Sequence, residues 1–163
     1  IENIQEINNS HFRKQKVNLS ITMEDFKSVL KGEVFINASI DKVWELWIDP
    51  DHIKNWNIIS NEWHTPIAQN DVRVGGKLYL KMEALDKSDG FDYECIYDKI
   101  IIHKEISHVG ADGRKTKLDF EETPQGVKVT ESFEPENHTP LDVQEAFCQS
   151  ILDNFKRYVE DAE

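Results

Sequence analysis

Cysteine is scarce in this sequence, and long apolar stretches are missing from it. Its two cysteines, Cys95 and Cys148, lie far apart and form no C-x-x-C pair, so we interpret both as small buried hydrophobes rather than as a disulfide or metal site. No uninterrupted apolar run approaches the roughly 20 residues that a spanning helix needs, and no basic segment followed by an apolar one indicates a secretory signal. We therefore expect a cytoplasmic protein with no membrane partner.

Positive charge is also in deficit. The 19 Lys and Arg residues stand against 31 Asp and Glu residues, which gives a formal net charge of -12. A surface of this sign repels phosphate backbones and anionic lipids, and no Lys/Arg cluster offsets it. We therefore expect no nucleic-acid partner. With 39% hydrophobic and 31% charged residues over 163 positions, the composition is typical of one globular domain.

The motifs of several common catalytic classes are not found. The sequence has no G-x-S-x-G elbow, no G-x-x-x-x-G-K-[ST] loop and no G-x-G-x-x-G after a strand, which counts against hydrolases, nucleotide-binding proteins and dehydrogenases. Its six histidines form no H-x-H or H-x-x-x-H pair, so we predict no metal site and expect no cofactor. An enzyme that uses scattered residues around a cavity stays open.

The chain divides into a short first segment and one domain. Residues 1–28 are polar and poorly patterned, and we interpret them as an N-terminal arm whose membership of the domain stays open. Residues 29–163 show no internal repeat, low-complexity linker or second domain. They are interpreted as a single domain of ordinary size.

The beginning of this domain has the pattern of a strand followed by two helices. Residues 29–38 are β-branched and partly alternating, which predicts a strand. Ser39 is a candidate N-cap for a helix whose apolar residues recur at spacings of three and four. Pro50 ends that helix, and Asp51 is expected to cap a second short helix through Trp56.

Beyond Ile58 the apolar period changes to two and indicates strands. Short turns rich in Gly, Asp and Ser separate them, so consecutive strands should pair antiparallel. A helix from about Leu141 to Glu160 follows, and its wide apolar stripe can be covered only by the sheet. The sequence thus predicts an α+β fold, in which a curved antiparallel sheet of about seven strands wraps around a long C-terminal helix, with two short helices after the first strand. The expected later strands are 62–68, 77–85, 91–97, 99–109, 115–122 and 127–134.

Several short segments together match a known sequence signature. They are residues 56–57, 62–66, 70–77, 82–84, 90–94, 128–133 and 151–159. Together they resemble a signature of one bacterial branch of the START-like (helix-grip, SRPBCC) superfamily. That branch is similar to the C-terminal domain of the co-chaperone that activates the ATPase of the ninety-kilodalton heat-shock protein. The resemblance covers residues 29–160 or so.

The resemblance implies a helix-grip fold around a cavity, and it does not specify an activity. START-like domains include lipid carriers, hormone receptors, aromatic cyclases and ring-hydroxylase subunits, so fold-level analogy cannot choose among them. The branch usually has Gly where this chain has Cys95, and Gly-Trp where it has Ala146-Phe147. The larger Cys would narrow the implied cavity, whereas Phe in place of Trp would widen it.

Strand parity places one carboxylate on an apolar face. In the last strand, Glu131 shares a face with two valines and Phe133. Such a group could orient a ligand or act as a general acid or base, or it could be held in a salt bridge by an arginine such as Arg73. His64 and Arg73 are the other candidate polar handles; for His64, a structural hydrogen bond to backbone is the alternative.

The expected lining of the cavity is mostly aromatic. Along residues 91–97, three aromatic residues and Cys95 share one face. Under the C-terminal helix they would line an apolar interior, and the alternative is that they fill a solid core. The candidate lining residues are Trp63, Met82, Phe91, Tyr93, Cys95, Phe120, Glu131, Phe133, Phe147, Ile151 and Phe155.

The function that these patterns favour is non-catalytic binding of a small apolar or amphipathic molecule inside the cavity. One alternative is a chaperone-associated module that docks on a chaperone through its surface. Another is an enzyme of the cyclase or dehydratase kind, with Glu131 or His64 as its base. No catalytic residue is assigned, and the sequence does not indicate the identity of the ligand or the oligomeric state.

Overall fold

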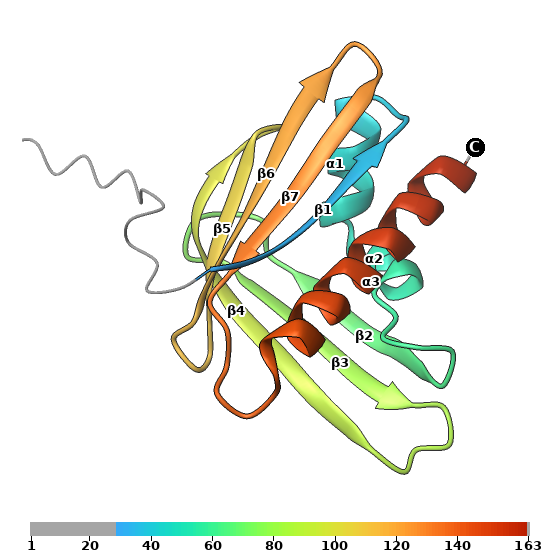
Figure 1. Cartoon of the computed structure of the whole chain (residues 1–163), viewed down its shortest axis with the longest axis vertical. Coiled ribbons are helices and arrows are strands. Elements are labelled where there is room, and N and C mark those ends of the chain that lie inside the picture. Colours follow the sequence, from blue (N-terminus) through green and yellow to red (C-terminus); the bar gives the residue numbers. More distant parts are fainter. Residues whose placement is uncertain (1–28, 163) are drawn as a thin grey trace, which may run out of the picture.

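The computed structural model describes residues 29–162, so the arm expected over residues 1–28 lies outside the described residues. Within the described range, seven strands and three helices follow the expected order (Figure 1). They are β1 (Leu30–Ile36), α1 (Ile40–Ile48), α2 (Pro50–Trp56), β2 (Trp63–Asn70), β3 (Lys77–Ala84), β4 (Gly90–Ile101), β5 (Glu105–Gly110), β6 (Lys115–Thr123), β7 (Gly126–Phe133) and α3 (Leu141–Asp161).

The strands form one antiparallel sheet in the order β1-β7-β6-β5-β4-β3-β2. Strands β2 to β7 form a meander, and β1 closes the series by pairing with β7. The sheet curls, and α3 lies across its concave side (Figure 1). The expected α+β helix-grip architecture is therefore confirmed, including the two short helices after the first strand.

One expected strand is wrong in its bounds. Residues 99–109 do not form a single strand, because residues 99–101 complete β4 and β5 begins only at Glu105. The reversal between them is tight: the Lys104 amide donates to the Ile101 carbonyl at 2.9 Å, and His103 adopts a left-handed backbone with φ 63°. Left-handed turns usually use Gly or Asn, so the apolar run through this segment gave no sign of a turn.

The two short helices are capped by neighbouring residues. Ser39 is the N-cap of α1 as expected, and its hydroxyl accepts from the Lys42 amide at 3.3 Å. The cap of α2 is Asp49 rather than Asp51, because the Asp49 carboxylate accepts from the Asp51 amide at 2.8 Å. Pro50 therefore opens α2 instead of only ending α1, in the first helical position, which needs no backbone donor.

The core lies where α1 and α2 meet the sheet and the second half of α3. Trp47 stacks on Trp56 with ring centroids 4.8 Å apart, and the Phe155 ring meets both indoles edge-on. Trp44 and Trp47 in turn contact the Phe120 ring on β6. These large rings fill the volume between three helices and the sheet, so this end of the concave face is solid.

Helix α3 also covers the free edge of β1. Gln149 exchanges two hydrogen bonds with the backbone of Glu33, at 3.1 and 2.9 Å. Further along, the Lys156 ammonium donates to the Phe35 carbonyl, and Glu160 accepts from the Asn37 amide. An edge strand whose backbone groups are already bonded offers little to another strand.

The helix approaches β1 closely at Gly32. A Cβ atom on Gly32 would lie 2.8 Å from the Cys148 Sγ atom and 3.0 Å from the Leu152 Cδ1 atom. Glycine is required here because the helix occupies the space of a side chain. This contact holds the first half of α3 beside β7, where Glu131 pairs with Gly32.

Candidate functional site

The concave face of the sheet has a sealed half and an accessible half. Four of the expected lining residues, Met82, Cys95, Phe120 and Phe155, are at most 5% exposed, and all of them except Cys95 belong to the main core cluster. For these four, the alternative of a packed core describes their surroundings. These buried side chains therefore form the floor of the site and present little accessible surface to a ligand.

The other expected lining residues retain accessible surface. Trp63, Tyr93, Glu131, Phe133 and Ile151 are half-buried, and all of these except Glu131 pack against the core as partly buried apolar residues. Phe91 and Phe147 are more exposed than expected for cavity residues, at 46% and 44%. We call this set the inner patch: Trp63, Phe91, Tyr93, Glu131, Phe133, Phe147 and Ile151.

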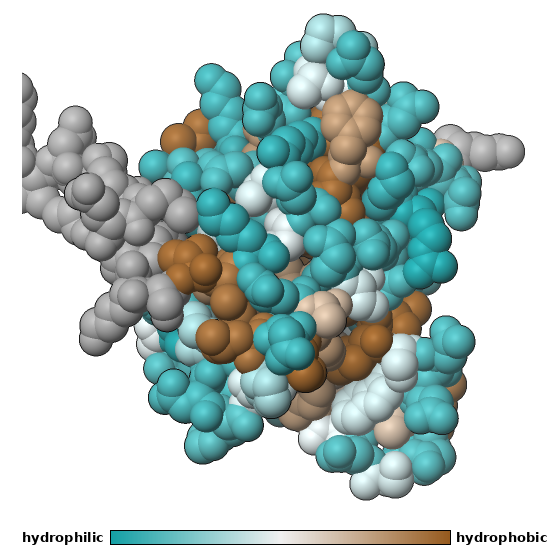
Figure 2. Space-filling view, viewed as in Figure 1, coloured by the Kyte–Doolittle hydropathy of each residue, from teal (hydrophilic) through white to brown (hydrophobic). Residues whose placement is uncertain are grey.

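Register in the sheet explains why the strand residues of the inner patch share one side. Tyr93 pairs with buried Leu80, and Phe91 pairs with buried Met82, so both rings point to the concave face. The Trp63 and Phe91 rings lie 5.8 Å apart. Figure 2 shows apolar atoms gathered between the lower side of α3 and strands β2 and β3.

Glu131 is the carboxylate of the inner patch. Its strand neighbours are Gly32 and Leu118, and the first half of α3 passes over it. Burial raises the pKa of the Glu131 carboxyl to about 7, and a hydrogen bond with the Cys148 thiol lowers that pKa by a smaller amount. The carboxyl is thus enclosed by protein atoms, although the residue retains some accessible surface. It can be neutral or charged near pH 7.

The two other expected polar handles lie elsewhere. Arg73 is 69% exposed in its side chain and forms an ion pair with Asp71 at 2.8 Å, so it is not the partner of Glu131. The His64 ring bonds to the Glu83 carboxylate at 3.1 Å rather than to backbone. Glu83 alternates with buried Met82 and Ala84, so this pair points to the convex side of the sheet. Neither residue joins the inner patch.

His108 is a residue of this site that the sequence did not single out. It pairs with Tyr97 on β4 and with Thr116 on β6, and its ring meets those of Tyr93 and Tyr97 edge-on at 6.4 and 6.1 Å. It is 7% exposed, and burial lowers the pKa of its imidazole to about 4. Among the described residues, its Nδ1 atom has no hydrogen-bond partner. The signal available in the sequence was a polar side chain at a position where strand alternation places the face of buried Ile106.

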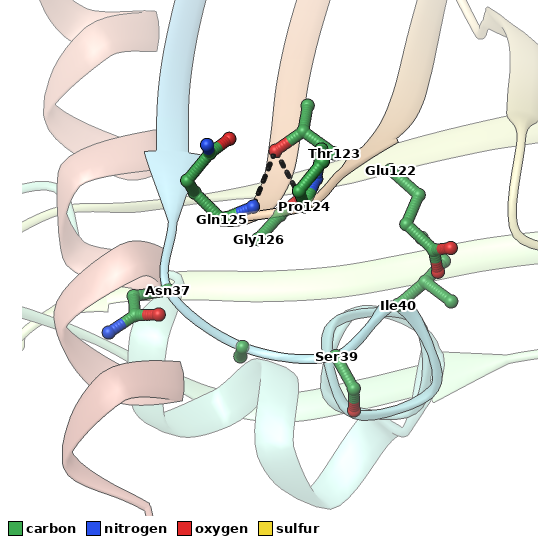
Figure 3. Close-up of a pocket in the computed structure, with 9 residues that line it drawn as sticks. Asn37, Ser39, Ile40, Glu122, Thr123, Pro124, Gln125 and Gly126 are labelled. Carbon is green, nitrogen blue, oxygen red and sulfur yellow. Dashed lines mark hydrogen bonds between the residues drawn. The ribbon is translucent and has the colours of Figure 1, made fainter.

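Two hollows lie away from the inner patch. One, of about 370 Å³, lies between the residues that link β1 to α1 and the β6–β7 hairpin (Figure 3). Its wall is turn backbone, in which the Thr123 hydroxyl bonds to the Gln125 amide and the Gly126 carbonyl. The other, of about 670 Å³, is lined by charged residues, among them Lys31, Lys117 and Asp119. Neither hollow contains any residue of the inner patch.

Over residues 29–162, no three His, Cys, Asp or Glu side chains converge as metal ligands would. None of the helices in that range is both long enough and apolar enough to span a bilayer.

Comparison with known proteins places the chain in a family. The family model described as Activator of Hsp90 ATPase homolog 1-like protein matches residues 37–160. A similar solution structure, of a protein of that kind from Aeromonas hydrophila, is 39% identical with a TM-score of 0.78, and the match covers 82% of this chain and 92% of the other. A Cytophaga hutchinsonii protein is also 39% identical, with a TM-score of 0.72 and coverage of 81% and 92%.

More distant structures share only the fold. A Nitrosomonas europaea protein has a TM-score of 0.69 at 13% identity, with coverage of 81% and 94%. No curated protein matches the chain. The family match spans most of the domain and agrees with the helix-grip architecture, so the chain belongs to the Activator of Hsp90 ATPase homolog 1-like family of the START-like superfamily.

Proposed function

We propose that the inner patch binds a small apolar or amphipathic molecule without chemical conversion. The START-like superfamily commonly binds hydrophobic ligands. In this chain the support comes from aromatic side chains that are continuous with the core yet keep accessible surface. Such a surface gains from being covered, since apolar burial contributes about 25 cal/mol per Å². A ligand that buries about 200 Å² would gain on the order of 5 kcal/mol before the entropic costs of binding.

The observation that carries the proposal is the position of Glu131. A carboxyl in a solid apolar core is costly without a partner, and replacement by an apolar residue would remove that cost. Glu131 instead shares its face of β7 with the partly accessible Phe133 ring, and the Cys148 thiol on α3 lies close enough to affect the pKa of its carboxyl. An apolar surface with one polar group that fixes orientation is the usual composition of a small-molecule site.

Native mass spectrometry of protein purified from its own host tests the proposal, followed by denaturing extraction of whatever co-purifies. We expect a stoichiometric apolar adduct. Ile151→Trp should abolish it, because the indole would fill the accessible space beside α3. Ile96→Trp is the matched control, since Ile96 is 42% exposed and pairs with Lys77 and Val109 on the convex side. An adduct that survives Ile151→Trp would contradict binding at the inner patch.

A second candidate is docking on the ninety-kilodalton heat-shock protein, which the family description names. The apolar residues Leu141, Val143 and Phe147 are all exposed on the first half of α3 and could serve as a contact surface. This candidate predicts that the chain raises the ATPase rate of the host's chaperone. An unchanged rate, measured together with a ligand adduct, would favour the inner-patch proposal instead.

A further inference from the structure

The concave and convex faces of the sheet carry different charged side chains. Lysines on the described strands point to the convex face, and five of them have carboxylate partners there: Lys77 pairs with Glu94 at 3.1 Å, and Lys117 pairs with Asp119 at 2.8 Å. Lys81, Lys99 and Lys128 do the same with Glu83, Glu105 and Glu33. Strand alternation therefore leaves the concave face without a lysine among the described strands.

The concave face instead offers a carboxylate and an imidazole nitrogen. No ion pair of Glu131 occurs within residues 29–162, and the buried Nδ1 atom of His108 has no partner in the same range. The His108 ring contacts the Tyr93 ring, and Glu131 lies on the same face of β7 as Phe133. Two polar groups that lack a protein cation thus lie beside one aromatic surface.

One cation at the rim, Arg114, is already bound. Arg114 lies close enough to influence Tyr93, but its Nε atom donates to the Asp112 carboxylate at 2.7 Å. Glu145 on α3 adds a further negative charge, which acts on the Cys148 thiol. An anionic head group entering here would meet the Glu131 carboxylate, and no lysine on the described strands faces it to balance the charge.

We infer that the inner patch selects amphipathic molecules whose polar head donates hydrogen bonds, with a protonated amine preferred over a carboxylate or phosphate. The inference rests on the proposed function and adds the chemical class of the ligand. The aromatic residues contact the apolar body, and Glu131 accepts from the head. The ammonium also gains from an aromatic ring on the same face of β7, that of Phe133, because ring faces attract cations.

The test uses three probes with one ring system and different heads: 1-naphthylmethylamine, 1-naphthylmethanol and 1-naphthoate. Affinities for the whole chain are measured by calorimetry at pH 7 and moderate salt. We expect the amine to bind about tenfold or more tightly than the naphthoate, since a charge-assisted hydrogen bond contributes on the order of 1.5–3 kcal/mol. The alcohol should fall between them.

Two variants locate the selectivity. Glu131→Gln should reduce amine affinity about tenfold and change alcohol affinity by less than about threefold. Glu145→Gln is the matched control, because it removes one exposed carboxylate near the same helix turn. Equal losses in both variants would assign the preference to the general negative field of the chain and would overturn the inference.

A measurement on the unaltered protein keeps the inference testable if Glu131→Gln does not fold. Amine affinity should rise between pH 6 and pH 8 as Glu131 loses its proton, while alcohol affinity should not rise. The other titratable groups facing Glu131 are Cys148 and Tyr93, whose pKa values are raised by burial, so they stay neutral over this interval. His108 also stays neutral, because burial lowers the pKa of its imidazole to about 4.

The outcomes separate the inference from the function on which it rests. Tight binding of the naphthoate at the inner patch would overturn the amine preference and leave ligand binding intact. Failure of all three probes to bind, together with a clean apo mass from the host, would overturn both. If NMR titration of the protein with the probes gave chemical-shift changes only at residues outside the inner patch, that result would also overturn the inference.

Discussion

Two buried ionisable groups with opposite pH behaviour face the same concave surface. The pKa of Glu131 is raised to about 7, so its contribution to stability is present at low pH and is lost as pH rises through about 7. The pKa of His108 is lowered to about 4, so its contribution is present above its ordinary value of 6.5 and is lost as pH falls toward 4. As pH rises from about 4 to about 7, the stability lost through Glu131 and the stability gained through His108 oppose each other. The free energy of unfolding of the unaltered protein should therefore change little with pH over this range.

Replacing one of these groups should reveal the pH dependence of stability that the other contributes. Glu131→Gln removes the cost of ionising a buried carboxyl, so the variant should gain stability relative to the unaltered protein at pH 8 but not at pH 5. The difference between the two pH values should be on the order of 3 kcal/mol at most, from a shift of about 2.5 units. Urea unfolding at both pH values measures it. An equal effect of the substitution at pH 5 and pH 8 would contradict the raised pKa.

At single positions, the sequence predicted which face of the sheet a side chain lies on better than it predicted that side chain's bonding partner. Strand alternation correctly placed Glu131 on the concave face, because β7 is regular throughout. It could not show that Arg73 pairs with Asp71, since such pairing depends on the turn after β2. The contact of Cys148 with Glu131 was also hidden, because it depends on how α3 lies over β1.

The packing of α3 on β1 depends on the missing side chain of Gly32. Gly32→Ala should destabilise the protein by about 1–3 kcal/mol, because the new methyl group overlaps Cys148 and Leu152. Thermal unfolding of the single variant measures this loss. The double variant Gly32→Ala/Cys148→Ala should recover part of it, since removing the thiol sulfur relieves the nearer clash. If the two substitutions were simply additive, the close approach would not be the cause.

At the scale of elements, the sequence predicted the helices and the number of strands because their signals are local. Helix periodicity, Ser39 as a cap and Gly-containing turns each act within a few residues. The β4–β5 reversal was missed because His103 adopts a glycine-like conformation inside an apolar run. Which half of the concave face is solid could not be predicted, since that depends on where α1 and α2 place their tryptophans.

For the molecule as a whole, the core described over residues 29–162 is built from β1 and the elements that follow it. A chain that begins at residue 29 should therefore unfold cooperatively with nearly the stability of the full chain, within about 0.5 kcal/mol. Circular dichroism during chemical denaturation compares the two chains. A clear loss of stability on removing residues 1–28 would show that they belong to the folding unit.

The bonds between Gln149 and the Glu33 backbone join residues 116 positions apart. During synthesis β1 leaves the ribosome early, but its two partners, β7 and α3, are translated last. The first strand must therefore remain unpaired for most of translation, with both backbone edges open to other nascent chains. Ribosomes that stall before α3 should release aggregation-prone products, so this small domain should depend on holdase chaperones more than its size alone implies.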